Sequence, residues 1–331
     1  MVNTKMIGSR IAEARKKINI SQAQLAQRLF ISPQAVGKWE RGESMPDITT
    51  FNRLAKILGI DLNYFSEGSN SGTTEVVAGE QLSGKRGNKL SWNMSCGNWV
   101  DADFSGLKNL HEKFSSSNMQ RCKFIGSDMS GLLLKRNNIE CCDFSGSDIS
   151  GSQIQSSNLD NILFKDTSLK EVKILRSHIK GCDFSSSDIS SSHIQSSYFE
   201  NNLFKDSSLK EAEFIKSYIQ GCDLSGANFT GTTFKSGGFQ ENTVTNAVWN
   251  NSSFIATQIA DVVFNSTLED CYFEDCVFNW VKFQNTTLIN TFFKNTRFKR
   301  IQFVDCQVDR ITYEFLKSGK ADLSGITLLT L

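Results

Sequence analysis

Two side chains four residues apart, Gln34 and Lys38, have the chemistry to recognise the edges of base pairs. A glutamine amide can pair with adenine in the major groove, and a lysine ammonium prefers the acceptor atoms of guanine. Ser32 lies just before them, where its hydroxyl and the N–H groups of a helix start could hold a phosphate. Since residues four apart share one face of a helix, this chemistry needs a helix here. Ordinary solvated surface would look the same, so the interpretation depends on the surrounding elements.

The other reactive side chains form no catalytic or metal-binding pattern. The three histidines, His111, His178 and His193, are scattered and have no evident nucleophile or partner. Seven of the nine cysteines fall on one recurring small position, where a thiol acts as a compact apolar filler. We therefore expect no enzyme activity, no metal and no cofactor.

Apolar spacing and capping residues predict five short helices over residues 6–66. Ser21 is a typical N-cap for a helix from Gln22 to Leu29. Ser32 is the corresponding cap of the next helix, which ends near Gly42. That next helix carries the glutamine and the lysine.

The segment SQAQLAQRLFISPQAVGKWERGESMPDITTFNRLAKILGI resembles the helix-turn-helix of the phage-repressor (Xre/Cro-like) family. The features that coincide are Ser21-Gln22, Leu25-Ala26, Ser32, Trp39-Glu40-Arg41-Gly42, Pro46 and Leu54-Ala55. The resemblance covers about residues 6–66. It implies that the second and third helices dock on double-stranded DNA, with the third helix in the major groove.

This resemblance also implies roles for individual residues. The predicted DNA-binding residues are Gln22, Ser32, Gln34, Lys38 and Arg41. Arg15 and Glu40 match a family pair that ties the first helix to the recognition helix, and we expect them to form a structural ion pair. The chain departs from the family at Pro33, where members often have a polar contact residue.

A different rhythm runs from Met94 to Tyr313, where a large apolar residue occupies almost every fifth position. Helices and strands have side-chain periods of 3.6 and 2.0, so neither explains it. The residue two places before each large one is mostly small, as in Ser157 before Leu159. Such a period predicts one short unit stacked many times.

The five-residue pattern resembles the pentapeptide-repeat family over about residues 92–313. This implies an all-β right-handed quadrilateral β-helix with four repeats per coil. About eleven coils would make a rod of roughly 50 Å at the spacing of neighbouring strands. Phenylalanines twenty residues apart, from Phe104 to Phe204, should then form one stack, and the shortened step before Leu268 predicts a bulge or kink over residues 265–268.

The predicted architecture is therefore multidomain, a small all-α domain joined to an all-β solenoid. We expect a helix-turn-helix domain over 1–67, a flexible linker over 68–91, the β-helix over 92–313 and a C-terminal cap or dimerisation tail over 314–331. The first 70 residues carry a net charge of +4 and the remainder −3, which suits a leading segment that contacts nucleic acid. No apolar run could span a membrane and no signal peptide is evident, so we expect a cytoplasmic protein with reduced thiols.

The last residues are too apolar to stand free in water. A short capping helix is expected over 314–318, which an open coil end needs in order to avoid edge-to-edge growth. The apolar tail residues are Ile326, Leu328, Leu329 and Leu331. They could fold back over the last coil or pack against a second chain. Because rods of the resembled family often dimerise through this end, we expect a homodimer.

These features favour a sequence-specific DNA-binding regulator whose rod dimerises or holds a partner protein. One alternative is a mimic of duplex DNA that binds DNA gyrase or topoisomerase and protects it from quinolones or toxins. Mimicry needs a continuous acidic face, and five aspartates do line up, namely Asp143, Asp148, Asp183, Asp188 and Asp223. Lysines interleave with carboxylates elsewhere, which weakens this reading. A third possibility is a protein-binding scaffold.

Overall fold

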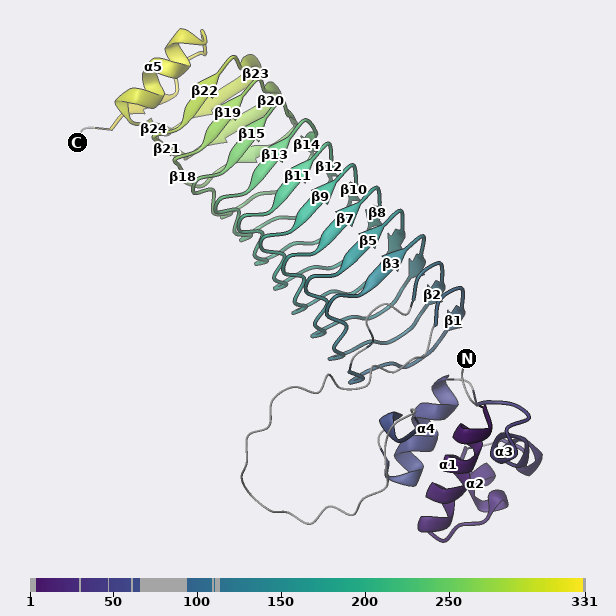
Figure 1. Ribbon diagram of the computed structural model, residues 1–331. Coiled ribbons are helices and arrows are strands. Elements are labelled where there is room, and N and C mark those ends of the chain that lie inside the picture. Colours follow the sequence, from purple (N-terminus) through teal and green to yellow (C-terminus); the bar gives the residue numbers. More distant parts are fainter. Residues whose placement is uncertain are drawn as a thin grey trace, which may run out of the picture. The chain divides into compact units, whose positions relative to one another are not determined.

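A computed structural model describes residues 4–29, 31–46, 48–60, 62–65, 94–108, 110 and 114–329. The chain divides into two compact units, Met1–Asn93 and Met94–Leu331 (Figure 1). The predicted linker over residues 68–91 lies outside the described residues.

The first unit consists of short helices. They are α1 (Thr4–Lys17), α2 (Gln22–Leu29), α3 (Pro33–Glu40), α4 (Ile48–Leu58) and the 3-10 turn η1 (Leu62–Phe65). The five helical segments predicted for this stretch are confirmed.

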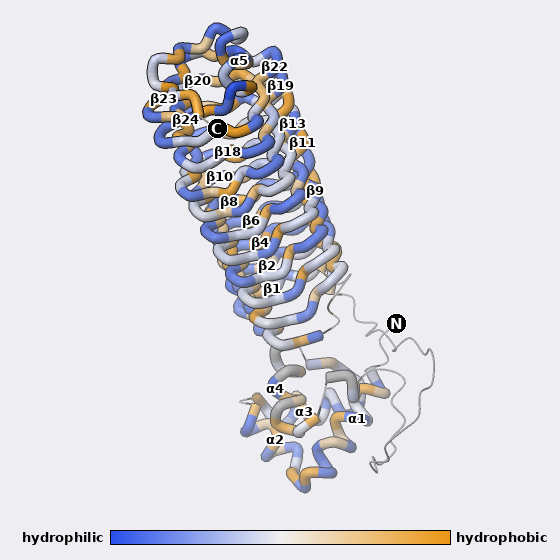
Figure 2. The backbone as a smooth tube through the Cα atoms, turned by 90° about the vertical axis from the view of Figure 1, so that its left-hand side faces the viewer, coloured by the Kyte–Doolittle hydropathy of each residue, from blue (hydrophilic) through white to orange (hydrophobic). Residues whose placement is uncertain are grey.

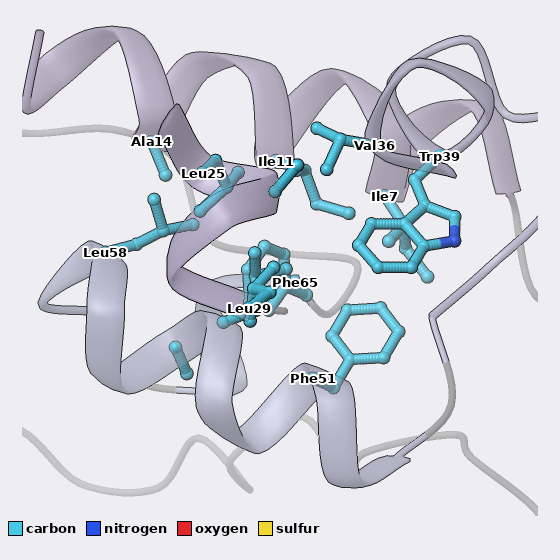
Figure 3. Packing of buried hydrophobic residues seen from close by; sticks show 13 residues of the cluster. Ile7, Ile11, Ala14, Leu25, Leu29, Val36, Trp39, Phe51, Leu58 and Phe65 are labelled. Carbon is cyan, nitrogen blue, oxygen red and sulfur yellow. The ribbon is translucent and has the colours of Figure 1, made fainter. Parts of the chain in front are cut away.

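Each helix of the first unit contributes apolar side chains to a single core (Figure 3). The labelled core residues are Ile7, Ile11, Ala14, Leu25, Leu29, Val36, Trp39, Phe51, Leu58 and Phe65. The Phe51 and Phe65 rings meet edge to face, with centroids 5.3 Å apart. Burial of this shared core holds helices that are too short to be stable alone.

Serine side chains fix where α2 and α3 begin. The Ser21 hydroxyl accepts from the Gln24 N–H at 3.1 Å, and the Gln24 amide oxygen accepts from the Ser21 N–H at 2.8 Å. This reciprocal capping box satisfies two otherwise unpaired donors. At α3 the Ser32 hydroxyl accepts from the Ala35 N–H at 3.3 Å, and Pro33 fills the first turn, where no N–H is needed.

The second unit is a parallel β-solenoid of about eleven coils. The largest sheet contains β1 (Asn98–Val100), β2 (Asn118–Gln120), β4 (Asn138–Glu140), β6 (Asn158–Asp160), β8 (His178–Lys180), β10 (Tyr198–Glu200), β12 (Tyr218–Gln220), β14 (Gly238–Gln240), β16 (Gln258–Ala260), β17 (Val263–Phe264), β20 (Val277–Gln284) and β23 (Arg297–Val304). Another sheet contains β3 (Leu133–Lys135), β5 (Gln153–Gln155), β7 (Lys173–Leu175), β9 (His193–Gln195), β11 (Glu213–Ile215), β13 (Thr233–Lys235), β15 (Ser253–Ile255), β19 (Tyr272–Glu274) and β22 (Phe292–Lys294). The smallest sheet contains β18 (Leu268–Glu269), β21 (Thr287–Ile289), β24 (Cys306–Val308) and β25 (Ile326–Leu328). Ladders of single parallel bridges complete the coils.

Successive coils are in register at a spacing of twenty residues, as in the pairing of Tyr198 with Tyr218. The predicted phenylalanine stack from Phe104 to Phe204 is confirmed, with neighbouring ring centroids 4.5–5.2 Å apart. Polar and apolar residues alternate along every coil (Figure 2). The large apolar residue of each side points inward because that is the one direction shielded from water.

Most corners have a small or hydrogen-bonding side chain inside and a left-handed residue outside. Buried Ser157 accepts from the Asn137 N–H at 3.0 Å, and its hydroxyl lies 3.0 Å from the Gln155 carbonyl. The outer corner residue takes a positive φ even where it is not glycine, as at Glu171 (56°). A residue in this left-handed region turns the chain sharply at the corner.

The coil is irregular at residues 265–268, where a bulge or kink was predicted, but the irregularity is not a bulge. No extra residue is accommodated; one is missing, so the register shortens to nineteen and Phe254 pairs with Phe273. No residue between Asp261 and Asp270 takes a positive φ, so this corner lacks its left-handed turn. The stack nevertheless continues, with the rings of Phe264 and Phe283 5.0 Å apart. The corner, not the strand, absorbs the deletion.

The C-terminal end is covered by α5 (Arg310–Ser318), which begins four residues before the predicted helix. Asp309 caps it by accepting from the Thr312 N–H at 2.8 Å. Leu316, on the inner face of this helix, is fully buried. Tyr313 therefore lies in a helix and is not the centre of a last repeat. The chain then returns as β25, which pairs with β24.

Candidate nucleic-acid interface

Helix α3 has one buried face and one free face. Val36 and Trp39 point into the core, and Gln34 and Lys38 are exposed on the other side. Neither exposed side chain makes a hydrogen bond or ion pair with any residue that the structure describes. Ser32 is also exposed, but its hydroxyl is the N-cap of the helix. The free face could therefore present an amide and an ammonium to a groove of DNA.

Glu40, at the end of α3, is the centre of a network that joins three helices. Arg15 Nε and Nη2 lie 2.6 and 3.0 Å from the two Glu40 carboxylate oxygens. Arg15 Nη1 also donates to the Ile20 carbonyl at 2.7 Å. The two charged side chains are only 11% and 8% exposed. Burial by itself would raise the pKa of Glu40, but hydrogen bonds from Arg15 and Gln22 outweigh burial and lower it.

Gln22 belongs to this same network. Its amide nitrogen donates to Glu40 Oε2 at 2.7 Å, and the side chain is half-buried. Sequence reasoning assigned Gln22 only a DNA contact and missed its link to α3. A DNA contact through the remaining amide oxygen stays a prediction.

Arg41 follows α3 and is more than half exposed. Its guanidinium pairs with the Glu43 carboxylate, at 2.6 Å from Nε to Oε1 and 3.1 Å from Nη2 to Oε2. The hydrogen bond from Arg41 lowers the pKa of Glu43. A phosphate would have to compete with Glu43 for Arg41, so the predicted DNA contact of Arg41 is weaker than its charge alone suggests.

Two glycines that sequence reasoning did not select bring the helices close together. A Cβ added to Gly8 on α1 would lie 2.2 Å from the Trp39 carbonyl oxygen. A Cβ on Gly37 would lie 3.1 Å from Arg41 Nη1 and 3.7 Å from Gln22 Oε1. Glycine inside a helix costs about 1 kcal/mol relative to alanine. Its presence at these two buried positions is the signal that could have indicated close packing.

The predicted dimerisation residues lie at the far end of the solenoid. Ile326 and Leu328 are in β25, whose pairing with β24 shows that the tail folds back over the last coil. Leu328 remains 45% exposed, and Leu329 is half-buried. Leu331 lies outside the described residues.

The part of the chain that the structure describes contains no group of histidine, cysteine and carboxylate side chains that could hold a metal ion. All nine cysteines are free thiols. Burial raises the pKa of Cys182 to about 12 and that of Cys222 to about 11, so these thiols are not nucleophiles at neutral pH. The described helices are all too short or too polar to cross a membrane.

Family models match both units of the chain. A helix-turn-helix model matches residues 11–65. A pentapeptide repeat region model matches residues 117–194, and a pentapeptide repeats model matches residues 192–231. A model described as the SV2A/B/C luminal domain matches residues 239–313. The first kind of match falls on the helical unit and the others fall on the solenoid.

Two curated relatives resemble part of the chain. Repressor protein C2 of Salmonella phage P22 is 35% identical over 103 residues, which cover 30% of this chain and 46% of the repressor. The SPbeta prophage-derived uncharacterized HTH-type transcriptional regulator YonR of Bacillus subtilis (strain 168) is 33% identical over 66 residues, which cover 20% of this chain and 61% of that protein. The chain thus spans about half the length of these relatives.

Among solved structures, a trypsin-treated variant of QnrB1, a plasmid-mediated fluoroquinolone resistance protein, is 17% identical. The match covers 71% of this chain and 91% of that chain, with a TM-score of 0.38.

Proposed function

We propose that this chain is a sequence-specific DNA-binding protein that regulates transcription. Its first unit belongs to the phage-repressor type of helix-turn-helix proteins, and its second unit belongs to the pentapeptide-repeat proteins. The observation that carries the proposal is the polar face of α3, which has no partner among the residues that the structure describes and is held on a buried scaffold. We assign the chain no catalytic step.

In this proposal α3 enters the major groove of double-stranded DNA. Gln34 pairs with an adenine, and Lys38 donates to the acceptor atoms of a guanine. The N–H groups at the start of α3, next to Ser32, hold a backbone phosphate. Pro33 has no N–H to donate, so base recognition rests on few side chains.

The Glu40 network supports this role by fixing the angle between α2 and α3. Arg15 holds the end of α3 against α1, and Gln22 holds the start of α2 against α3. Base recognition needs a rigid helix, because a shift of about 1 Å breaks a bidentate hydrogen bond. We propose that these three residues position α3 and contribute to recognition through it.

Gln34→Ala tests the proposal. On the preferred site, which genome-wide mapping of bound DNA would supply, we expect the variant to lose about 1–3 kcal/mol of binding free energy. Weak, salt-sensitive binding to random DNA should remain, because phosphate contacts supply it. Gln258→Ala, at an exposed glutamine of the solenoid, is the matched control. Equal affinities of both variants and the parent protein for the preferred site would show that Gln34 does not contact bases.

We propose that the solenoid serves dimerisation or binds a partner protein. The exposed Leu328 in the terminal strand β25 supports an association through the C-terminal end. A homodimer would present two helix-turn-helix units to DNA, as expected for this kind of domain.

Two features of the solenoid weigh against the alternative of a DNA mimic that binds gyrase. Along one side, Asp143, Asp183 and Asp223 alternate in register with Leu163 and Leu203. The aspartates that do line up are also paired with lysines of the preceding coil, Asp183 with Lys165 and Asp223 with Lys205, each at 3.1 Å. A mimic of DNA would need uninterrupted negative charge. We therefore expect the full chain to leave gyrase supercoiling unchanged.

A further inference from the structure

Charge is unevenly distributed along the solenoid. Residues 94–276 contain 15 lysines and arginines and 23 aspartates and glutamates, a net charge of −8. Residues 277–331 contain eight basic and four acidic residues, a net charge of +4. The last coils are therefore basic, although the coils before them are acidic.

The basic residues concentrate on β20 and β23, which lie side by side near the C-terminal end (Figure 1). These strands have eight residues each and continue around a corner without interruption. Their sequences, VFNWVKFQ and RFKRIQFV, contain four cations and no carboxylate. We call Trp280, Lys282, Arg297 and Arg300 the basic tip. The nearest carboxylates along the chain are Asp275 and Asp305, and Asp261 pairs through its backbone with the residue before Trp280.

The cations of the basic tip have no carboxylate partner among the described residues, whereas several cations of the acidic coils do. Lys165, Lys170 and Lys205 each pair with an aspartate of the following coil, at 3.1–3.3 Å. Lys282, Arg297 and Arg300 form no ion pair with any residue in the described part of the chain. Their charge is therefore not neutralised within the molecule.

Trp280 contacts one of these cations, Arg300, without occupying the hydrogen-bond donors of the arginine. The indole is 57% exposed, and the Arg300 guanidinium carbon lies 4.4 Å from its ring centroid. This cation–π contact holds the guanidinium close to the indole. It leaves the guanidinium N–H groups available for a second ligand. A planar fork of this kind matches the oxygens of a phosphate.

We propose that the basic tip binds the phosphate backbone of double-stranded DNA without reading its sequence. Three unpaired cations on two adjacent strands fit an extended polyanion, and duplex DNA carries one negative charge per about 1.7 Å. The choice of DNA over other polyanions rests on the proposed function, because a DNA-bound first unit would raise the local concentration of DNA around the tip. The solenoid would then add a second, salt-sensitive contact beyond the helix-turn-helix.

The test uses the full chain and a labelled duplex of random sequence, with binding measured by fluorescence anisotropy over a range of salt concentrations. The tip variant combines Lys282→Gln, Arg297→Gln and Arg300→Gln. The control combines Lys165→Gln, Lys170→Gln and Lys205→Gln, which removes the same charge from cations that are already paired. We expect the tip variant to flatten the plot of log Kobs against log salt by up to about 2.7, since each lost phosphate contact contributes about 0.9. The control should keep the slope of the parent protein.

Trp280→Ala provides a second variant that keeps every charge. It should weaken binding to the random duplex by a smaller amount than the triple variant, because Arg300 is no longer held in place. Thermal melting by circular dichroism would show that each variant is folded. Equal slopes for the tip variant and the control would overturn the proposal.

The main competing occupant is the acidic part of a second copy of this chain. In that case the tip variant would lose self-association at low salt, measured by light scattering, with an unchanged slope for DNA, and the proposal would be wrong. Failure of the proposed function has a different signature. A protein with no preferred DNA site would contradict sequence-specific regulation, and the slopes would still decide whether the tip binds DNA.

Discussion

Glu40 joins three helices of the first unit through two side chains, Arg15 on α1 and Gln22 on α2. A buried ion pair is a poor source of net stability, because its attraction mainly offsets the cost of removing both charges from water. Its geometry is specific, however, since two hydrogen bonds from a guanidinium and one from an amide meet on a single carboxylate. The network is therefore better understood as fixing the position of α3 than as strengthening the core.

The lowered pKa of Glu40 predicts how the first unit responds to acid. Its pKa in the folded state lies below its ordinary value of 4.5, so the unfolded chain takes up the proton first as the pH falls. The stability that Glu40 contributes is complete above pH 4.5 and is lost as the pH drops through the lower folded pKa. We expect Glu40→Gln to remove this part of the acid dependence, measured by urea unfolding followed by helical circular dichroism. Glu13→Gln, at a half-exposed ion pair with Lys17, is the control and should change little.

The same variant should also destabilise the first unit at neutral pH. It leaves the buried Arg15 guanidinium without its counter-charge, at a cost of up to about 3 kcal/mol. An unfolding free energy equal to that of the parent protein at pH 7 would contradict this account of the network.

Individual residues differed in how far the sequence revealed them. Arg15 and Glu40 were expected as a pair because the family resemblance places them together. The link from Gln22 to Glu40 was missed, since residues 18 apart meet only through the packing of α2 on α3. The close approach at Gly8 was missed for the same reason, because a spacing pattern contains no distance between helices.

At the level of elements, the corners of the solenoid depend on hydrogen bonds from small polar residues. The Ser197 hydroxyl accepts from the Ser177 N–H at 3.2 Å and lies 3.0 Å from the Gln195 carbonyl. At the shortened corner, by contrast, the Ser266 hydroxyl is buried and has no hydrogen-bond partner among the described residues. This corner therefore keeps a small polar residue, Ser266, but because one residue is missing no backbone group is placed to pair with its hydroxyl.

This contrast predicts opposite outcomes for the same substitution. Ser197→Ala should destabilise the solenoid by about 1–2 kcal/mol, because it leaves a buried N–H unsatisfied. Ser266→Ala should be neutral or slightly stabilising, because it removes an unpaired hydroxyl. The comparison requires unfolding of the two variants under identical conditions. A loss at Ser266 as large as that at Ser197 would mean that the hydroxyl is paired in solution.

The elements of the solenoid were largely predictable, and its end was not. A five-residue period determines both the inward residue and the register, so the Phe104 to Phe204 stack follows from spacing alone. Tyr313 keeps the same period after Val308, but the Asp309 cap begins a helix there. Periodicity cannot distinguish a last repeat from a helix whose first turn has the same spacing. The missing residue before Leu268 was located correctly, but spacing did not show that the corner would absorb it.

For the whole molecule, the end of the solenoid determines how many copies act together. Leu328 is exposed on the terminal strand β25, which offers an unpaired edge to a second chain. We expect Leu328→Asp to shift a dimer towards monomer in sedimentation experiments, because it places a charge in an apolar contact. Leu203→Asp introduces the same charge at an exposed leucine on the side of the solenoid and should leave the oligomeric state unchanged. Equal molar masses for both variants and the parent protein would exclude this end as the interface.

Dimerisation through that end would constrain the DNA that two copies can hold. Eleven coils at about 4.8 Å give a solenoid of roughly 50 Å, so the starts of two solenoids joined end to end would lie about 100 Å apart. Paired helix-turn-helix units usually contact half-sites about 34 Å apart. We therefore expect footprinting to show two separated protected sites with looped DNA between them, and Leu328→Asp to abolish the loop while leaving each site protected. A single compact palindromic footprint would show instead that the helix-turn-helix units pair with each other, because solenoids joined at their far ends could not bring them that close unaided.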